Sequence, residues 1–537
     1  MFEQQVIITR MFKAVVATTR RIDPAAQPSA LVGGDTRRMT DERSIDAAQL
    51  SELTTTDDSV VPRASTRLVW ALFLCSVGVL ALTIRRGEPW TGVDYVVVDG
   101  LTAVLWVVVT FFSGIVHSYS RRYMAGDRDL ERFFARVFAF TLVVMALTAA
   151  DHVALFAAAW LAMGLLMAGL IGHVRDWEQA RAAGALARRY FVASSAVLAG
   201  SLAVLAWEAG TTSISGIFGG LEEVSATVGL VAAGGIVLAA LIQSALFPFH
   251  GWLLSSMTAP TPASALMHAG FVNAGGVLLT RFSPLVADHL AIMSAVVVLG
   301  AVSALLGQAM LLVQTDVKRK LGSSTMAQMG FMILQCGLGF FAAAIAHLVL
   351  HGFYKAYLFL SSGAAVEEAA PKSTAKHAGH TEFGFSSALL SLATAVGGGV
   401  LFGALTGKAT GLSFDSGTIL TLVVVLTTLT AARDILNRTT LPRSVRFVSV
   451  PLVVLTAIGG YALLYNAISA VVPSAMTHAS TDVTIAHGLV VALFVGAYVA
   501  TELGWHRSSE RLYVSLLNLS QPDSSTVLTN KEEYKDV

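Results

Sequence analysis

Charged residues are scarce in this sequence. Asp, Glu, Lys and Arg make up 13% of its 537 residues, whereas 55% of the residues are hydrophobic. Soluble globular proteins carry roughly a quarter charged residues. A chain of this length with so few charges cannot place most of its surface in water, so the composition excludes an ordinary soluble protein.

Cysteine is also nearly absent, since the sequence has only Cys75 and Cys336, far apart in separate apolar runs. Two such thiols are more typical of inert helix residues than of a disulfide or a metal pair. The sequence also lacks a Gly-rich phosphate loop, a Cys run for an iron–sulfur cluster and a Cys/His/Asp cluster for zinc. We therefore expect no cofactor and no metal on this chain, and no enzymatic chemistry of its own.

Long apolar runs dominate the rest of the chain. Runs of about 20 residues recur, and each can cross a hydrocarbon core of roughly 30 Å as a helix. The runs are continuous rather than alternating, which argues against a β-barrel. The predicted fold class is an all-α polytopic membrane protein with about 14 transmembrane helices. The expected spans are 66–84, 95–117, 134–150, 152–172, 190–208, 224–246, 249–281, 289–313, 322–340, 342–363, 384–407, 416–436, 447–471 and 483–503.

Three regions follow from this pattern. Residues 1–64 are polar and of mixed charge, which predicts a disordered cytoplasmic extension; an over-extended start and a docking segment are the alternatives. Residues 65–505 form the transmembrane domain, and residues 506–537 form a cytoplasmic tail. Four basic loops fall on one side of the expected spans, and the positive-inside rule makes that side cytoplasmic. Both termini are then expected on the cytoplasmic side of a bacterial inner membrane. These loops contain Arg121, Arg122, Arg128 and Arg132; Arg175, Arg181, Arg188 and Arg189; Lys318, Arg319 and Lys320; and Arg438 and Arg443.

Two places are expected to interrupt membrane helices. Pro248 and the Pro260-Thr-Pro262 segment remove backbone donors, so the helix must open there. The glycines between Gly397 and Gly411, around Lys408, are the second expected break. Paired interrupted helices indicate a binding or conduction site at the interface of structural repeats. We therefore expect two inverted repeats, near 134–281 and 289–471.

Ionisable residues inside the expected spans are candidates for function, because each costs several kcal/mol in a bilayer. His347, His351 and Lys355 follow one another at intervals of four residues and so share a helix face. A line of His and Lys can pass protons near neutral pH. The alternative is that each residue only packs against a neighbouring helix. The predicted proton or cation path comprises His250, His268, His347, His351, Lys355 and Lys408, with Asp94, Asp99 and Lys318 as possible accessory residues.

Several motifs carry a resemblance to a known superfamily. Phe247-Pro-Phe-His-Gly-Trp252 and the segment 259–268 resemble the broken-helix signature of the proton-pumping membrane subunits of respiratory complex I and of Mrp-type antiporters. The segments Gln314–Arg319 with Ser324–Gly330, and Ala346–Ala356, resemble two further signatures of that superfamily. The resemblance covers most of 95–440.

Two stretches, 118–127 and 267–281, resemble one branch of that superfamily, the DabB membrane subunits of the DAB inorganic-carbon accumulation complexes. The branch is associated with a cytoplasmic partner, DabA, whose zinc site resembles a β-carbonic anhydrase. The resemblance implies that cation flow, of protons in our interpretation, energises one-way conversion of CO₂ to bicarbonate by the partner. Zinc is thus expected on the partner, and no nucleic acid is expected.

The sequence departs from the superfamily pattern in the first half. A Trp-Glu pair is usual there, but this chain has Trp160-Leu161, and Gln243 stands where a Lys is usual. The usual Leu-Pro-Asp is Leu253-Leu254-Ser255. The second half keeps His347, His351, Lys355 and Lys408, so we expect one path, in the second repeat. The alternative function is a proton-translocating subunit of a quinone oxidoreductase or of an Mrp-type antiporter.

Overall fold

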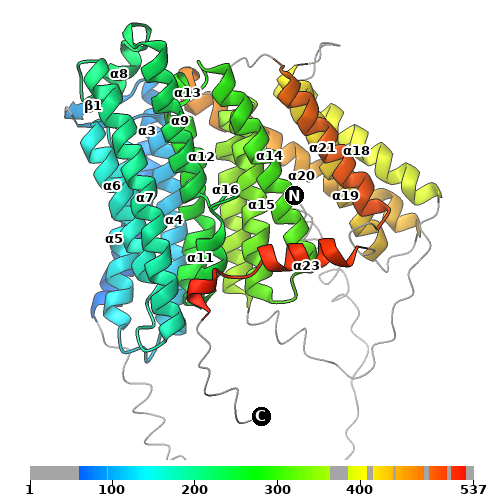
Figure 1. Cartoon of the computed structure of the whole chain (residues 1–537), viewed down its shortest axis with the longest axis horizontal. Coiled ribbons are helices and arrows are strands. Elements are labelled where there is room, and N and C mark those ends of the chain that lie inside the picture. Colours follow the sequence, from blue (N-terminus) through cyan, green and yellow to red (C-terminus); the bar gives the residue numbers. More distant parts are fainter. Residues whose placement is uncertain are drawn as a thin grey trace, which may run out of the picture.

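The structure is a computed structural model that describes residues 60–93, 95–362, 385–407, 415–438, 443–476, 483–504 and 509–527. Long helices stand side by side in one bundle (Figure 1). They are α3 (Val60–Arg86), α4 (Gly100–Tyr123), α5 (Leu130–Ala149), α6 (Val153–Ile171), α7 (Glu178–Glu208), α9 (Ala226–Gln243), α14 (Leu290–Val313), α15 (Val317–Gly337), α16 (Phe341–Leu360), α18 (Phe385–Thr406), α19 (Ser416–Arg438), α20 (Arg443–Val471) and α21 (Ile485–Glu502). The short helices α8 (Ile214–Gly219) and α13 (Ser283–Val286) and the broken segment α10–α12 connect them.

Twelve helices of the described residues are long and apolar enough to cross a membrane, which makes the chain a multi-pass membrane protein. Every expected span has a helical counterpart, but α15 is not among the twelve and α21 is only a shorter apolar helix. The all-α membrane fold is therefore confirmed, whereas the count of fourteen and the inverted repeat stay predictions.

The structure corrects where the first two spans begin. Helix α3 begins at Val60, so the last residues of the expected N-terminal extension are helical. The second span was expected from residue 95 but begins at Gly100. Residues Trp90–Val93 (β1) pair with Val96–Val98 (β2) in an antiparallel hairpin, and the Asp99 carboxylate then accepts a hydrogen bond from the Thr102 N–H and caps α4.

The first expected break is present. Helix α9 ends at Gln243, and the chain then forms α10 (Gly251–Ser255) and the 3₁₀ turn η3 (Ser256–Thr258) before α11 (Thr261–Ala269). A second interruption, the 3₁₀ turn η4 (Phe271–Asn273), separates α11 from α12 (Ala274–Arg281). The broken segment is thus divided at its middle as well as at its prolines.

The second expected break is absent at its first glycines, Gly397–Gly403. Helix α18 runs without interruption through Gly397–Gly403 and ends beside Gly407, which has a φ of +68°. Its glycines serve close packing instead. A Cβ on Gly398 would lie 2.5 Å from the Ile458 side chain, and one on Gly399 2.4 Å from Val425. Small residues allow membrane helices to approach closely. Lys408 and Gly411 lie outside the described residues.

The C-terminal segment is not simply a polar tail. Helix α23 (Glu510–Leu519) lies across the ends of the bundle helices rather than along them (Figure 1). The amide of Gln314, directly after α14, donates to the Ser520 carbonyl at 3.2 Å. The Arg319 guanidinium donates to the Gln521 side chain at 2.8 Å. These contacts fix residues 509–527 against the α14–α15 connection.

Candidate proton path

Helix α15 provides a polar surface in the interior of the bundle. The Asp316 carboxylate caps its start by accepting from the Arg319 N–H at 2.8 Å. A Cβ on Gly330 would lie 2.4 Å from the Ala304 backbone nitrogen, so α15 packs backbone to backbone against α14. The other side of α15 faces α16. The polar side chains of α15 that are buried are Ser323, Ser324, Thr325, Gln328 and Gln335.

Lys355 is the central residue of this interior surface. It lies on α16, its side chain has no exposed area, and its ammonium nitrogen donates to the Leu321 carbonyl at 3.0 Å and to the Ser324 hydroxyl at 2.9 Å. A cation inside a bilayer is costly and marks a functional site by default. Both bonds are to α15, so Lys355 connects α16 to α15.

His268 approaches the same carbonyl from α11. Its Nδ1 lies 2.9 Å from the Thr325 hydroxyl, and that hydroxyl donates its own proton to Leu321 at 2.9 Å. We assign the imidazole proton to Nδ1, because the Thr325 oxygen can then accept from His268 while its hydroxyl donates to Leu321; this tautomer leaves Nε2 as the basic nitrogen. The ring is fully buried and stacks on Phe359 at a centroid distance of 4.4 Å.

The other two histidines continue along α16, as their spacing predicts. The rings of His347 and His351 are stacked, with centroids 5.8 Å apart and planes 17° apart. Both residues are buried. The Nε2 atoms of His268, His347 and His351 are all buried without a hydrogen-bond partner among the described residues. Buried polar atoms of this kind are usually satisfied by water, so the geometry suits a hydrated row of proton carriers.

The sequence interpretation missed Gln335, near the end of α15, and its partner Tyr461 on α20. Gln335 donates its amide proton to the Tyr461 hydroxyl on α20 at 2.8 Å, while its own carbonyl oxygen is buried without a partner among the described residues. The Tyr461 hydroxyl lies 3.4 Å from the Ala343 carbonyl on α16. Gln335 lies ten residues beyond Thr325, which is not a same-face spacing on an α-helix, so the sequence pattern carried no signal for it.

Two further predicted residues form their hydrogen bonds outside the row of His268, His347, His351 and Lys355. Lys318 donates to the Met257 and Ala259 carbonyls at 3.2 and 3.3 Å, where η3 meets α11. His250 contacts the C-terminal segment through the Leu519 carbonyl at 3.2 Å, and burial lowers the pKa of this histidine. Asp94 and Lys408 lie outside the described residues. None of the contacts of His250 is with His268, His347, His351 or Lys355.

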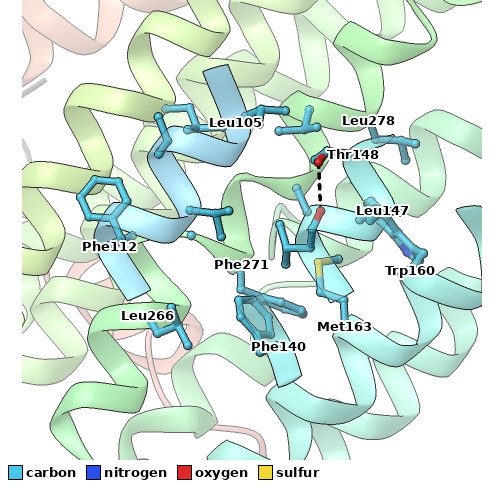
Figure 2. A pocket seen from close by; sticks show the side chains of 18 of the residues that line it. Leu105, Phe112, Phe140, Leu147, Thr148, Trp160, Met163, Leu266, Phe271 and Leu278 are labelled. Atoms are coloured by element: carbon cyan, nitrogen blue, oxygen red, sulfur yellow. Dashed lines mark hydrogen bonds between the residues drawn. The ribbon is translucent and has the colours of Figure 1, made fainter. Parts of the chain in front are cut away.

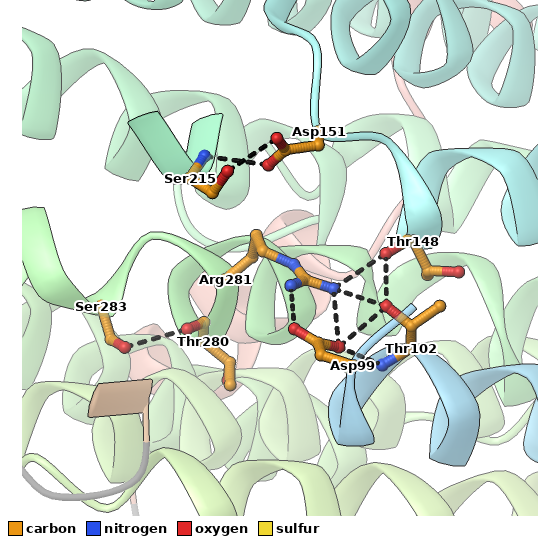
Figure 3. Close-up of polar contacts among 8 residues, drawn as sticks. All are labelled: Asp99, Thr102, Thr148, Asp151, Ser215, Thr280, Arg281 and Ser283. Carbon is orange, nitrogen blue, oxygen red and sulfur yellow. Dashed lines mark hydrogen bonds and ion pairs between the residues drawn. The ribbon is translucent and has the colours of Figure 1, made fainter. Parts of the chain in front are cut away.

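Asp99, at the start of α4, forms a buried ion pair with Arg281, at the end of α12 (Figure 3). The Arg281 guanidinium at the end of α12 bonds to the Asp99 carboxylate and also donates to the Thr102 hydroxyl and the Thr148 carbonyl, each at 2.8 Å. Burial raises the pKa of Asp99, but Arg281 and the bonds from Thr102 outweigh burial and hold that pKa below its ordinary value. Nearby, Asp151 accepts from the Ser215 N–H and hydroxyl at 2.8 and 2.7 Å. These contacts indicate a structural role for Asp99.

The first half of the bundle is apolar where the superfamily pattern has charges. Trp160 donates to the Ser194 hydroxyl at 3.1 Å, and Leu161 is half-buried. Gln243 is fully buried, with both amide atoms unpartnered among the described residues. Figure 2 shows the adjoining pocket, which is surrounded by aromatic and aliphatic side chains. Its lining includes Leu105, Phe112, Phe140, Trp160, Met163 and Phe271.

Within the described part of the chain, no three His, Cys, Asp or Glu side chains lie close enough together to hold a metal ion. Cys75 is exposed and Cys336 is buried, and both are free thiols. The arrangement that the structure does provide is a buried series of nitrogen bases, two of which, His268 and Lys355, contact hydroxyl groups of α15. Such groups can hold and release protons.

Comparisons with known proteins identify the family to which this fold is similar. Residues 150–429 match the family described as "NADH:quinone oxidoreductase/Mrp antiporter, TM", and residues 95–134 match "NADH-Ubiquinone oxidoreductase (complex I), chain 5 N-terminus". Among solved structures, a chain of the Mrp complex from Dietzia sp. aligns with a TM-score of 0.61 and 21% identity, over 87% of this chain and 57% of that chain.

Curated relatives fall into two groups. The chain is 36% identical over 280 residues to "Probable inorganic carbon transporter subunit DabB1" of Halothiobacillus neapolitanus, covering 51% of this chain and 50% of that protein. It is 39% identical over 279 residues to "Probable inorganic carbon transporter subunit DabB" of Bacillus subtilis, covering 50% and 53%. It is 37% identical over 276 residues to "NADH-quinone oxidoreductase subunit L" of Mycobacterium tuberculosis, covering 50% and 43%. The chain thus spans about half the length of these relatives.

The fold and the buried row of bases together define a multi-pass membrane protein of the antiporter-like type. Because the match over residues 150–429 includes more than half of the 537 residues, the chain belongs to the NADH:quinone oxidoreductase/Mrp antiporter transmembrane family. The resemblance that the broken-helix motifs predict is confirmed.

Proposed function

We propose that this chain is the proton-conducting membrane subunit of a two-protein inorganic-carbon accumulation complex in a bacterial inner membrane. Downhill proton flow energises one-way hydration of CO₂ to bicarbonate by a cytoplasmic partner that holds zinc. The observation that carries the proposal is the set of bonds joining Lys355 and His268 through Leu321 and Thr325. The names of the curated relatives from Halothiobacillus and Bacillus support the substrate class.

The chemistry of the row favours protons over sodium ions. Its members are imidazole and amine nitrogens, and the hydroxyl groups of Thr325 and Ser324 contact His268 and Lys355. Hard cations such as Na⁺ prefer oxygen ligands, above all carboxylates. Asp99 is a buried carboxylate of the kind that Na⁺ would need, but it forms an ion pair with Arg281. A row of nitrogen bases in which three imidazole Nε2 atoms are buried without a partner among the described residues instead supports stepwise proton transfer through water.

The first half of the bundle supports a conduit rather than a pump. Leu161 and Gln243 stand where the superfamily has Glu and Lys, so the first half lacks the Glu–Lys pair that would switch charge in a pumping cycle. The described part of the path therefore lies along α11, α15 and α16. One path without a second, coupled charge pair suits downhill flow that drives another protein.

The arginine-rich loops support the proposed orientation. Arg122 lies in the last turn of α4 and Arg128 follows that helix. Arg175 lies between α6 and α7 and Arg181 near the start of α7, so both basic clusters fall at the same end of the bundle. The positive-inside rule assigns that end to the cytoplasm. Helix α23 docks beside the α14–α15 connection, which carries Lys318 and Arg319, so the partner is expected to meet the chain at this cytoplasmic end.

The test is purification of the tagged chain from its native membrane, followed by mass spectrometry and metal analysis. We expect one stoichiometric partner that carries zinc and resembles a β-carbonic anhydrase. The similarity to a quinone-oxidoreductase subunit supplies the alternative. Recovery of several quinone-reductase or antiporter subunits without zinc would replace the proposed function with a proton-translocating subunit of such a complex.

A further inference from the structure

A groove with arginines at both ends lies between α6 and α7, away from the proton path. Leu165, Gly169 and Gly172 line it from α6, and Arg181, Gly184 and Arg188 line it from α7. A Cβ on Gly184 would lie 2.9 Å from the Gly172 Cα, so the two backbones nearly touch at the floor of the groove. Arg181 and Arg188 are seven residues apart and hence lie on one face of α7.

The groove has more positive charge than its own carboxylates can balance. Arg181 donates to the Arg175 carbonyl at 2.8 Å, and the carboxylate paired with it among the described residues is that of the exposed Glu178, at 3.4 Å. Arg188 is exposed and has no carboxylate partner in the described part of the chain. A third guanidinium, of Arg136 on α5, donates to the Gly169 carbonyl at 2.7 Å and so lies against the α6 side of the groove. The groove is therefore complementary to an anion.

The position of the groove along α7 points to the membrane surface. Trp207, near the opposite end of α7, is 88% exposed, as expected for an aromatic residue in the membrane interface. Arg188 precedes it by nineteen residues, which is about 28 Å of helix and close to the roughly 30 Å thickness of a hydrocarbon core. Arg188 thus lies at the opposite boundary, at the level of the lipid headgroups, and Arg181 lies further out.

Apolar side chains continue from the groove toward the membrane centre. Leu165 on α6 is 41% exposed, and Val192, one turn beyond Arg188 on α7, is 46% exposed. They offer a surface for an acyl chain whose headgroup occupies the groove. Basic pockets between transmembrane helices on the cytoplasmic side are typical sites for anionic lipid headgroups.

We propose that this groove binds an anionic phospholipid, with its phosphate between Arg181 and Arg188 and an acyl chain along Leu165 and Val192. A choline headgroup is disfavoured because its ammonium would lie among three guanidinium groups. The site is independent of the proton path and of the proposed substrate.

The test compares lipid retention by native mass spectrometry. The full chain is purified, incubated with equal amounts of phosphatidylglycerol and phosphatidylcholine, and analysed for bound lipid. We expect the unmodified chain to retain phosphatidylglycerol in preference to phosphatidylcholine. The double variant Arg181→Gln/Arg188→Gln should lose most of it. The control Arg122→Gln/Arg189→Gln removes the same charge from exposed arginines outside the groove lining and should retain it.

A second variant keeps the charge and fills the space. Ala185 lines the groove, so Ala185→Leu should also reduce phosphatidylglycerol retention while elution on size exclusion stays unchanged. Equal losses in the groove variant and the control would overturn the proposal in favour of general attraction of anionic lipid to basic surfaces. Equal retention of both lipids would overturn it by showing no headgroup preference. Displacement of the lipid by inorganic phosphate would show a site for a free anion. Loss of a co-purifying protein with lipid retention unchanged would show a protein interface.

Discussion

Lys355 of α16 and His268 of α11 converge on the same backbone carbonyl, that of Leu321 on α15. Lys355 reaches it directly at 3.0 Å, and His268 reaches it through the Thr325 hydroxyl, with 2.9 Å for each of the two bonds. The consecutive helices α15 and α16 are joined at this point to α11, which lies about fifty residues earlier in the sequence. Protonation of either base is therefore expected to change the proton affinity of the other through a short hydrogen-bonded bridge.

The Thr325 hydroxyl can be removed without changing the shape of the site. In Thr325→Val, the Nδ1 proton of His268 loses its acceptor, and leaving such a group buried costs about 1–3 kcal/mol. We expect proton flux in proteoliposomes, followed with a pH-sensitive dye, to fall about tenfold, which corresponds to roughly 1.4 kcal/mol. Thr325→Ser keeps the hydroxyl and should retain most of the flux. Equal flux in both variants would show that the bridge carries no function.

Close packing of α14 against α15 should depend on Gly330. In Gly330→Ala, the new Cβ would lie 2.4 Å from the Ala304 backbone nitrogen, and backbone cannot move aside as a side chain can. Overpacking of this kind costs about 1–3 kcal/mol, so we expect a lower thermal midpoint in detergent. The matched control is Gly460→Ala on α20, where a Cβ meets nothing within 4 Å. A drop of the same size in the control would contradict the packing argument.

The Asp99–Arg281 pair should stabilise the fold rather than conduct protons. In Asp99→Asn, Arg281 remains buried without its counter-charge, and breaking a buried pair in this way costs about 3–5 kcal/mol. The double variant Asp99→Asn/Arg281→Gln should be less destabilised than the single variant, measured as thermal midpoints in a double-mutant cycle. Additive effects would mean that the two side chains do not interact.

The same pair gives a pH dependence with a definite sign. Because the pKa of Asp99 is lowered in the folded protein from 3.8, its stabilisation is complete above that ordinary value and is lost as the pH falls through the lower folded-state pKa. The difference in thermal midpoint between the unmodified chain and Asp99→Asn should therefore be constant from pH 6 to pH 8. A difference that changes across this range would contradict the assignment.

Gln314 should hold the C-terminal segment in place. Its amide bonds to Ser520, so Gln314→Leu removes that contact. We expect faster hydrogen exchange at backbone amides in 509–527, measured by mass spectrometry, while α15 and α16 exchange as before. Lys320→Ala, which changes an exposed neighbour, is the control. Unchanged exchange in the Gln314 variant would mean that other contacts are sufficient to dock the segment.

The membrane fold and the shared helix face of three candidate residues could be predicted because they depend on local patterns. Runs of about 20 apolar residues predict membrane spans regardless of tertiary context. The four-residue spacing of His347, His351 and Lys355 specifies one helix face, and the structure places them there. The prolines near His250 correctly predicted an interrupted helix, since a proline cannot donate to the preceding turn.

The errors and omissions arise where the outcome depends on packing between distant segments. The glycines of α18 permit a break but do not require one, and contacts with Ile458 and Val425 use them for close packing instead. Asp99 was grouped with the path because the sequence does not show that Arg281, 182 residues later, pairs with it. Thr325 and Gln335 escaped notice because neutral polar residues on a helix are common, and only their partners on α11 and α20 distinguish them.

The most direct test of the central claim is the variant Lys355→Met in the assembled complex. Methionine fills a similar volume but cannot carry a proton, and Lys320→Met on the exposed start of α15 is the control. The measurement is intracellular bicarbonate accumulation in cells that express the chain with its co-purifying partner. The account predicts that Lys355→Met abolishes accumulation while the complex keeps its normal composition, and that the control accumulates normally. Accumulation at the unmodified level in Lys355→Met would contradict a proton path through Lys355.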